Sequence, residues 1–318
     1  MLKTTVIITA YNRKEFIKDA VNSVLENSQK PTEVIVVKNF KDEYVDSFLN
    51  EKGVINIYSD DETLGGKLAQ GIYQSSGDII FFLEDDDLFS KEKIRKVTQK
   101  FSRYELGFYH NSQQVFYDEL PVTEPIQDFL YYHSVGSKRM VNYLFSKLKV
   151  GFNVSSMAIS RDLADKCVKL LKNVKITADT FLFFCAVENN SPIMVDFEKL
   201  TYYRVLRGRN AVKSPNISLF RMQYEDALYF KSVFSSKALS DIIDRSVRQR
   251  EMIYKLVSKE VNKKEALIYS LKLVSDLFRS PNKWNVFLLA LSILAIISKE
   301  SSRKIFLEKT YSNSVLSS

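Results

Sequence analysis

Strand-like runs alternate with helical patterns along the first 90 residues of the chain. β-branched and aromatic residues dominate segments 4–10, 33–37 and 54–58, whereas apolar residues within 14–26 recur every three or four positions. Runs of the first kind are typical of buried strands, and the second pattern is typical of an amphipathic helix. Because strands that alternate with helices form βαβ units, the sequence predicts an α/β fold around a largely parallel sheet.

The pattern becomes less regular beyond residue 90, although helical and strand-like segments still alternate. From about Ser218 onward the chain contains no glycine and is rich in Lys, Leu and Ile. This change predicts a boundary between an α/β domain over 1–217 and a helical region over 218–318. We expect further helices over 68–74, 91–102, 138–147, 162–171 and 179–188, and further strands over 79–83, 107–117, 152–160 and 199–205.

Composition narrows the class of protein. Apolar residues make up 45% of the chain and charged residues 26%, which is typical of a globular protein. The net charge of +8 suits an anionic partner such as a nucleotide or a phospholipid surface, but no compact basic motif predicts binding of nucleic acid. Cys167 and Cys185 lack metal-ligand or redox spacing, so we expect reduced thiols and no disulfide. The absence of a secretory signal pattern predicts a cytoplasmic location.

Four consecutive carboxylates, Glu84, Asp85, Asp86 and Asp87, follow the apolar run 79–83. Like charges at the end of a buried strand raise one another's pKa and reduce stability unless a cation lies among them. The simplest cation is Mg²⁺ or Mn²⁺, which prefers oxygen ligands and commonly binds a substrate phosphate as well. An acidic turn that faces solvent is the alternative interpretation.

The helical region contains an apolar segment over 286–298. Its thirteen residues are fewer than the roughly 20 needed to span a bilayer, so a buried helix of a small bundle is the first interpretation. An interfacial membrane helix is the alternative, because Trp284 and the basic residues Lys272, Arg279 and Lys283 lie nearby. We expect this region to contact a membrane surface peripherally or to build a homo-oligomer.

Several separated segments together resemble an inverting glycosyltransferase of family 2 with the GT-A fold, a Rossmann-like, mostly parallel sheet flanked by helices. The resemblance covers about residues 3–212 and depends on the order of the segments. They are TAYNR at 9–13, LGGKLAQGI at 64–72, the acidic strand end, FNVSSMAISRD at 152–162, ITADTFLFF at 176–184, and YYRVLRGRNAV at 202–212.

The resemblance implies a nucleoside-diphosphate-sugar donor, a Mn²⁺ or Mg²⁺ cofactor, and a glycan or lipid-linked acceptor. Asp179 matches the family's catalytic base, and Asp86 matches the residue that coordinates the metal directly, with Asp87 supporting the metal site. Gly65 and Gly66 are expected in a turn that lets the backbone approach a ligand. The residues expected to bind the donor are Thr9, Ala10, Tyr11, Arg13, Asn39, Lys67, Glu84 and Asp85.

The chain departs from the family pattern in three segments, at four residues. Glu84 replaces the first Asp of the acidic motif, and Ala178 replaces the Glu that usually precedes the catalytic Asp. Lys38 and Asn39 stand where the family generally has an acidic pair that reads a uridine base. Because lysine accepts no hydrogen bond from a base N–H, guanosine and thymidine donors remain open beside uridine.

Other roles and other functions stay open from the sequence. Asp179 taken alone fits a helix N-cap as well as a base. One of Arg204, Arg207 and Arg209 is expected to bind phosphate, and the histidines His110 and His133 are expected to be structural. The rival functions are a nucleotidyltransferase and a catalytically inactive nucleotide-sugar-binding scaffold.

Overall fold

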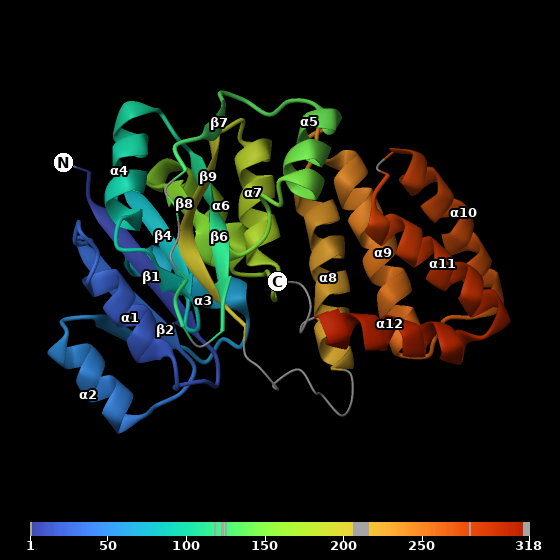
Figure 1. Cartoon of the computed structure of the whole chain (residues 1–318), viewed down its shortest axis with the longest axis horizontal. Helices are drawn as coiled ribbons and strands as arrows, with labels where there is room; N and C mark the ends of the chain where they lie inside the picture. Colours follow the sequence, from blue (N-terminus) through green and yellow to red (C-terminus); the bar gives the residue numbers. More distant parts are fainter. Residues whose placement is uncertain are drawn as a thin grey trace. The chain divides into compact units, whose positions relative to one another are not determined.

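The computed structural model describes residues 2–117, 119–121, 124, 126–205, 216–279 and 281–313. The chain divides into two compact units. The described residues up to 205, with 236–239, form an α/β unit, and the remaining described residues form a helical unit. Figure 1 shows the α/β unit as a sheet covered by helices. The described part of the helical unit contains helices and no strand.

A nine-stranded sheet, counted over the described residues, organises the α/β unit in the order β3-β2-β1-β4-β8-β6-β9-β5, with β7 beside β9. Its first four strands are parallel, as the sequence predicts, and every residue of the first strand is buried. They are β1 (Thr4–Ala10), β2 (Glu33–Lys38), β3 (Ile55–Tyr58) and β4 (Ile79–Glu84).

The other half of the sheet is mixed. β8 is antiparallel to both β4 and β6, whereas β6 runs parallel to β9. The strand expected over 199–205 is the end of a longer strand, and most of the expected strand over 152–160 is a loop and a 3₁₀ turn. These strands are β5 (Leu88–Phe89), β6 (Phe108–Phe116), β7 (Phe129–Tyr132), β8 (Met157–Ser160) and β9 (Ile193–Arg204).

Helices cover both faces of the sheet (Figure 1). The sequence analysis missed one of them, α2, which begins after the N-cap Asp42. Lys138–Lys147 is helical as expected, although its second half, Tyr143–Lys147, is π-helical. The helices are α1 (Ile17–Leu25), α2 (Glu43–Glu51), α3 (Leu64–Gln74), α4 (Lys93–Arg103), α5 (Lys138–Asn142), α6 (Arg161–Leu171) and α7 (Ala178–Glu188).

The expected turn at Gly65 and Gly66 is wrong, because both glycines lie in the first turn of α3. Thr63 caps this helix by accepting a hydrogen bond from the Gly66 N–H at 3.0 Å. A Cβ at Gly65 would lie 2.2 Å from the carbonyl oxygen of Leu171, so this glycine allows α3 to pack closely against α6.

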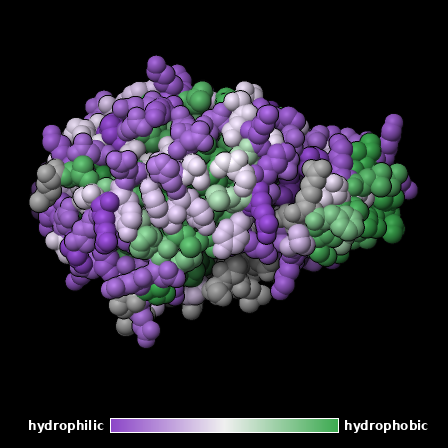
Figure 2. Space-filling model, turned by 90° about the horizontal axis from the view of Figure 1, so that it is seen from above, coloured by the Kyte–Doolittle hydropathy of each residue, from purple (hydrophilic) through white to green (hydrophobic). Residues whose placement is uncertain are grey.

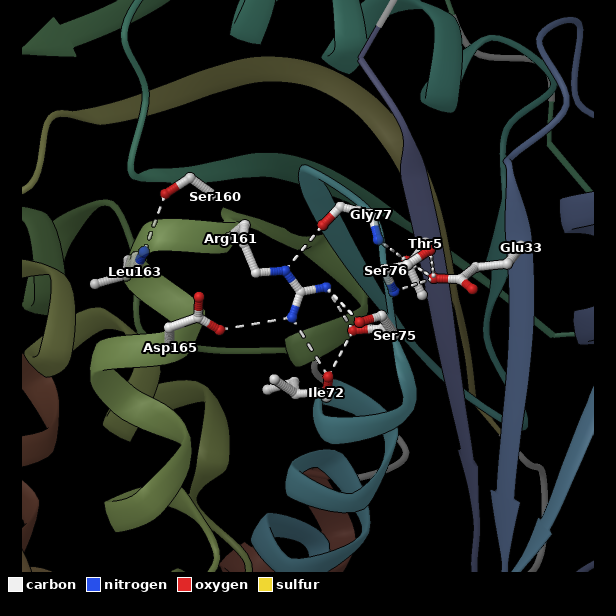
Figure 3. A network of polar contacts seen from close by, with 10 residues as sticks. All are labelled: Thr5, Glu33, Ile72, Ser75, Ser76, Gly77, Ser160, Arg161, Leu163 and Asp165. Atoms are coloured by element: carbon white, nitrogen blue, oxygen red, sulfur yellow. Dashed lines mark hydrogen bonds and ion pairs between the residues drawn. The ribbon is translucent and has the colours of Figure 1, made fainter.

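Arg161 fixes the loop before β4 at the end of the sheet opposite to the acidic residues (Figure 3). Its guanidinium donates hydrogen bonds to the carbonyl oxygens of Gly77 and Ser75, both at 3.0 Å, and to the Ser75 hydroxyl at 2.7 Å. The arginine of the segment 152–162 therefore stabilises the fold at the C-terminus of α3, far along β4 from Glu84.

The expectation of two reduced thiols is wrong, because Cys167 and Cys185 form a disulfide. Cys167 lies on α6 and Cys185 on α7, and the packing of these helices brings their Cα atoms to 6.3 Å. Both residues are buried. Spacing along the sequence gave no sign of this pair, since it depends on how two helices pack.

Five helices make up the described part of the helical unit. They enclose a core of their own that includes Leu256, Leu273 and Leu288. None of the described helices has both the length and the apolar content to cross a membrane. The helices are α8 (Ile217–Val233), α9 (Ser240–Val257), α10 (Lys263–Arg279), α11 (Lys283–Ile297) and α12 (Lys299–Asn313).

Candidate active site

Parallel pairing of β1 with β4 brings the TAYNR segment and the acidic cluster to one edge of the sheet. Thr9 pairs with Glu84, and the Asp85 N–H donates a hydrogen bond to the Thr9 carbonyl at 3.1 Å. Ala10 pairs with Lys38 at the end of β2, so Asn39 follows at the same edge. Carboxyl ends of strands in open α/β sheets are where such proteins bind ligands.

Arg13 supplies a cation to the acidic cluster. Its guanidinium donates to both oxygens of Asp85, at 2.8 and 2.5 Å, and lies 2.7 Å from Oδ2 of Asp86. Burial alone would lower the pKa of Arg13, but the hydrogen bonds and charges of these carboxylates raise it overall. Burial raises the pKa of Asp85, and Arg13 opposes this rise. The guanidinium of Arg13 therefore supplies part of the positive charge that the sequence predicts among the carboxylates.

Lys93, the first residue of α4, lies fully buried near the acidic cluster. Its ammonium donates hydrogen bonds to the Ser155 carbonyl at 2.5 Å and the Thr201 hydroxyl at 2.8 Å. Burial lowers its pKa well below the ordinary value, and the charge of Asp87 opposes this change. Lys93 was not predicted, because α4 carries four further basic residues, Arg95, Lys96, Lys100 and Arg103, and the sequence does not reveal which of the five is fully buried.

Arg204, at the end of β9, holds the acidic turn in place. Its backbone N–H donates to Oδ1 of Asp87 at 3.1 Å, and its Nε donates to the Asp86 carbonyl at 2.9 Å. The guanidinium also lies 4.5 Å from the ring centroid of Phe16 and 4.7 Å from that of Phe116. Arg204 thus positions the acidic residues, while Arg207 and Arg209 lie outside the described residues.

Glu84 and Asp87 hold protons more tightly than ordinary carboxyls. Burial raises the pKa of Glu84 well above its usual value, and the charges of Asp87, Asp86 and Asp179 raise it further. Burial and the charge of Asp86 raise the pKa of Asp87 to about 7, against hydrogen bonds from Ser155 and the Arg204 N–H. Such pairs of perturbed carboxyls are typical of functional sites.

Tyr203 also faces the carboxylates, and the sequence analysis did not select it. Burial, followed by the charges of Asp87, Glu84 and Asp86, raises the pKa of its hydroxyl to about 12. The side chain is nevertheless 37% exposed, so a ligand at the sheet edge can reach it. Its place next to Arg204, within the segment 202–212 that resembles the family, is a signal that could have selected it.

Asp179 is the second residue of α7 and does not serve as its N-cap, which is Thr177. One oxygen of Asp179 accepts the Asn153 N–H at 3.0 Å, and the other accepts the Thr180 N–H at 2.7 Å. Asn153 adopts a left-handed backbone conformation, with φ of 63°. Asn153 also accepts the Ser155 N–H at 2.9 Å, and the Ser155 hydroxyl accepts the Glu84 N–H at 3.0 Å, so short hydrogen bonds connect the two acidic motifs at one site.

The other residues expected to bind a donor lie at the same edge but differ in access. The Tyr11 side chain is 48% exposed, whereas Thr9 and Ala10 are buried, so their backbone is what a ligand would meet. Lys67 is buried with its ammonium 4.8 Å from the Tyr11 ring centroid. Burial lowers the pKa of Lys67, and the charges of Asp61 and Glu62 oppose this.

The two departures at the end of β2, Lys38 and Asn39, have different structural roles. Lys38 is buried and forms an ion pair with Asp46 at 2.7 Å, so its charge is satisfied within the fold. Asn39 accepts the Asn12 N–H at 2.8 Å and donates its amide to the Asn12 side chain at 2.9 Å. Asn39 therefore remains at the site, where its amide group orders the turn after β1.

The carboxylates fit a divalent cation that takes most of its ligands from elsewhere. Within the described residues, no three acidic, histidine or cysteine side chains lie together as a ready metal cage. However, Oδ2 of Asp87 is buried and no hydrogen bond reaches it, and the Asp86 side chain is partly exposed. Mg²⁺ and Mn²⁺ suit carboxylate oxygens, and Mg²⁺ usually binds one or two carboxylates, water and substrate phosphates.

Sequence comparison identifies relatives of this chain. The family model of glycosyl transferase family 2 matches residues 5–168. An uncharacterized glycosyltransferase of Rickettsia felis is 24% identical over 219 residues, which are 67% of this chain and 35% of that protein. The curated relatives are therefore much longer than the stretch they share with this chain.

Structural comparison gives the fold. S. aureus TarS 1-349, in its complex with UDP-GlcNAc, superposes with a TM-score of 0.61 at 14% identity, covering 98% of this chain and 92% of that one. The mannosyltransferase PcManGT of Pyrobaculum calidifontis, in complex with GDP-Man and Mn²⁺, gives 0.56 at 13% identity, covering 98% and 85%. The expected GT-A fold is confirmed, and the chain belongs to glycosyl transferase family 2.

Proposed function

We propose that the protein is a glycosyltransferase that moves a sugar from a nucleoside-diphosphate sugar to an acceptor hydroxyl with inversion at the anomeric carbon. The observation that carries the proposal is the chain of hydrogen bonds between Asp179 and the acidic turn. The Asn153 N–H donates to Asp179 at 3.0 Å, the Ser155 N–H donates to the Asn153 side chain at 2.9 Å, and the Glu84 N–H donates to the Ser155 hydroxyl at 3.0 Å. TarS and PcManGT, which share the fold, are recorded with a UDP sugar and a GDP sugar. The base of this chain's donor therefore stays open.

The donor would lie between the end of β1 and the acidic turn. Tyr11 is exposed there and offers a ring on which a nucleobase can stack. Asn39 offers amide groups to the base, and the backbone of Thr9 and Ala10 lies beneath. Asp86 and Asp87 would hold Mn²⁺ or Mg²⁺, which when bound stabilises the negative charge that grows on the departing diphosphate.

Asp179 would act as the base. Two backbone N–H groups orient its carboxylate, at 3.0 and 2.7 Å, and keep the side chain half-buried at the site. The carboxylate would take the proton from the acceptor hydroxyl while the hydroxyl oxygen attacks the anomeric carbon opposite the leaving group. A single displacement of this kind needs no covalent nucleophile, and the acceptor is proposed to be a glycan or a lipid-linked molecule.

An inactive nucleotide-sugar-binding scaffold is the second candidate. It is favoured by Ala178 and Glu84, which replace usual acidic residues, and by the ion pair in which Arg13 already engages Asp86 at 2.7 Å. A scaffold would bind the donor without turnover. For the helical unit, we propose an attachment role, either at a membrane surface or in a homo-oligomer.

The test is release of nucleoside diphosphate from a panel of UDP, GDP and dTDP sugars, with Mn²⁺ or Mg²⁺ and candidate acceptors. We expect turnover with one donor, lost in Asp86→Ala and reduced by about 10² to 10⁴ in Asp179→Asn. Asp162→Asn is the matched control, because Asp162 is exposed on α6. Donor binding by calorimetry without release from any donor would favour the scaffold. Equal turnover in Asp179→Asn would exclude Asp179 as the base.

A further inference from the structure

Two neighbouring helices of the helical unit expose apolar stripes. On α10 the stripe is Leu267, Leu271, Val274 and Phe278, and on α11 it is Val286, Ala290, Ile293 and Ile297. Both stripes have the spacing i, i+4, i+7 and i+11, which places their members along one helix face. The exposed fractions reach 85% at Phe278 and 77% at Ile297.

The opposite faces of the same helices build the core of the unit. Leu273 is 2% exposed, and Leu288 and Leu291 are 0% and 2% exposed. Each helix is therefore apolar on two sides, and the core accounts for only one of them. Figure 2 shows hydrophobic side chains gathered over the α10–α11 part of the helical unit, with hydrophilic residues beside them. A continuous exposed apolar patch is typical of an interaction surface.

The charges around the stripes have one sign. The exposed charged side chains described on the two helices are all lysines: Lys263, Lys264, Lys272 and Lys283. Lys264 and Lys283 each precede their stripe by three residues and therefore lie beside it.

The acidic residues of the same helices are paired elsewhere. Glu265 lies 2.7 Å from the ammonium of Lys255 on α9. Asp276 is 2% exposed and lies 2.5 Å from the guanidinium of Arg248 on the same neighbouring helix. The surface of α10 and α11 thus combines apolar stripes with lysines, and no exposed acidic side chain is described on these two helices.

We propose that this α10–α11 face binds the surface of a bilayer that contains anionic phospholipids. Apolar side chains enter the boundary between headgroups and acyl chains, while lysines contact the phosphates. Phe278 and Trp284 lie near the turn between the helices, and aromatic residues are favoured at that depth. Because α10 and α11 are only about 22 to 26 Å long, they lie along the surface.

A second copy of the chain fits this face less well. A symmetric dimer through the α10–α11 face would bring the lysines of one copy toward those of the other, and like charges at an interface oppose association. Anionic headgroups complement the same lysines. The proposal concerns a surface remote in sequence from the acidic turn, and it does not depend on the transferase activity.

The chain contains its own probe for the test, because Trp284 is its only tryptophan and is 43% exposed at the start of α11. The full-length protein is mixed with vesicles of phosphatidylcholine, with and without phosphatidylglycerol, and sedimentation and Trp284 emission are recorded. We expect a blue shift and co-sedimentation only with phosphatidylglycerol, and at least about a tenfold loss of binding at high salt.

Two variants separate the apolar from the electrostatic contribution. Leu271→Ser with Phe278→Ser, and Lys264→Glu with Lys283→Glu, are each expected to weaken binding about tenfold or more. Ile55→Ser and Lys52→Glu, at exposed positions of the α/β unit, are the matched controls and should bind as the unmodified protein does. Nucleotide release measured in parallel shows whether the α/β unit is intact.

Three outcomes would overturn the proposal. One is that the unmodified protein does not bind anionic vesicles. Another is that both double variants bind these vesicles as strongly as the unmodified protein does. The third is a dimer of the unmodified protein that Leu271→Ser with Phe278→Ser converts to monomer, because the face would then be an interface between copies. If the unmodified protein released no nucleoside diphosphate from any donor, the proposed transferase function would be contradicted. The membrane proposal would not be, because vesicle binding does not require catalysis.

Discussion

The two units of the chain depart from ordinary globular proteins in opposite ways. The α/β unit buries charge: Asp85, Asp87 and Lys93 are between 0% and 3% exposed at the sheet edge. The helical unit also buries charge, as at Asp276, but unlike the sheet edge it exposes a row of apolar side chains, with Leu271 and Phe278 67% and 85% exposed. Charged residues are seldom fully buried and large apolar patches are seldom exposed, so each departure supports the role proposed above for its unit.

The two departures differ in how the protein compensates for them. Buried charges need partners, and the acidic turn receives them from Arg13 and Arg204 within the fold. The exposed stripes of α10 and α11 have no comparable compensation in the described residues. The proposed active site is thus ordered by the fold before a ligand binds, whereas the proposed docking surface would be completed by its partner.

Replacement of the buried lysine tests the internal compensation most severely. In Lys93→Met, the Ser155 carbonyl and the Thr201 hydroxyl lose a donor, and Asp87 loses a nearby cation. Removing one member of a buried charged network typically reduces the free energy of unfolding by about 3 to 5 kcal/mol. Urea denaturation measures this loss.

The control for that experiment is Lys91→Met, because Lys91 is exposed two residues earlier. Its effect should stay within about 0.5 kcal/mol. Combining Lys93→Met with Asp87→Asn should recover part of the loss, since an uncharged amide needs no cation. If Lys93→Met alone were as stable as the unmodified protein, the buried network would be unimportant for the fold.

Two leucines of α10 test the contrast within the helical unit. Leu273→Ala removes a side chain from the core and should reduce the free energy of unfolding by about 2 to 5 kcal/mol. Leu271→Ala changes a side chain that is 67% exposed, and its effect should be within about 0.5 kcal/mol. Similar losses in the two variants would mean that a partner or a second copy already covers Leu271 in solution.

The sequence was sufficient for the parallel half of the sheet but not for the mixed half. Every residue of the segments 4–10 and 79–83 is buried, and neither segment contains a charged residue, as expected of strands covered on both faces. β9 was shortened in the prediction, since Asp196 and Glu198 interrupt its apolar pattern. Their charges are satisfied by Lys100 and Lys96 from α4, a contact that no local pattern reveals.

The candidate site followed the same rule. Motif order brought out Asp86 and Asp179, whose positions depend on elements with clear local signals. Lys93, Tyr203 and the disulfide between Cys167 and Cys185 depend on which side chains meet across β9, α4, α6 and α7. Contacts of this kind form when segments that are far apart in the sequence pack together. The spacing of residues along the chain therefore does not predict them.

The buried histidine provides a test that depends on pH. Burial lowers the pKa of His110 from its ordinary 6.5 to about 4, while its hydrogen bond with the Phe152 carbonyl opposes the change. Between these values the unfolded chain binds more protons than the folded one. Stability should therefore fall as pH decreases from about 6.5 to about 4, by up to about 3 kcal/mol from this group.

His110→Gln should remove that pH dependence, because an amide keeps a donor for the Phe152 carbonyl and does not titrate in this range. His133→Gln is the matched control, since His133 is exposed. Chemical denaturation at pH 4.5 and 7 measures the difference for each variant. Parallel pH profiles for His110→Gln and the unmodified protein would contradict burial of a neutral imidazole.

The smallest expected effect concerns the turn that would meet the base of the donor. In Asn39→Asp, one oxygen still accepts the Asn12 N–H, but the other opposes the Asn12 side-chain oxygen to which Asn39 now donates. Loss of one hydrogen bond should cost about 1 kcal/mol. Asn12 has φ of 50°, so the turn also loses a contact that holds a left-handed backbone. The family generally has an acidic pair here that reads a uridine base, and Asn39→Asp restores one member of it. Asn39→Asp should therefore raise the preference for a UDP sugar over a GDP sugar, measured as the ratio of the two kcat/KM values. An unchanged ratio, with Asn39→Ala also unchanged, would place base recognition elsewhere and leave Asn39 with a purely structural role in the α/β unit.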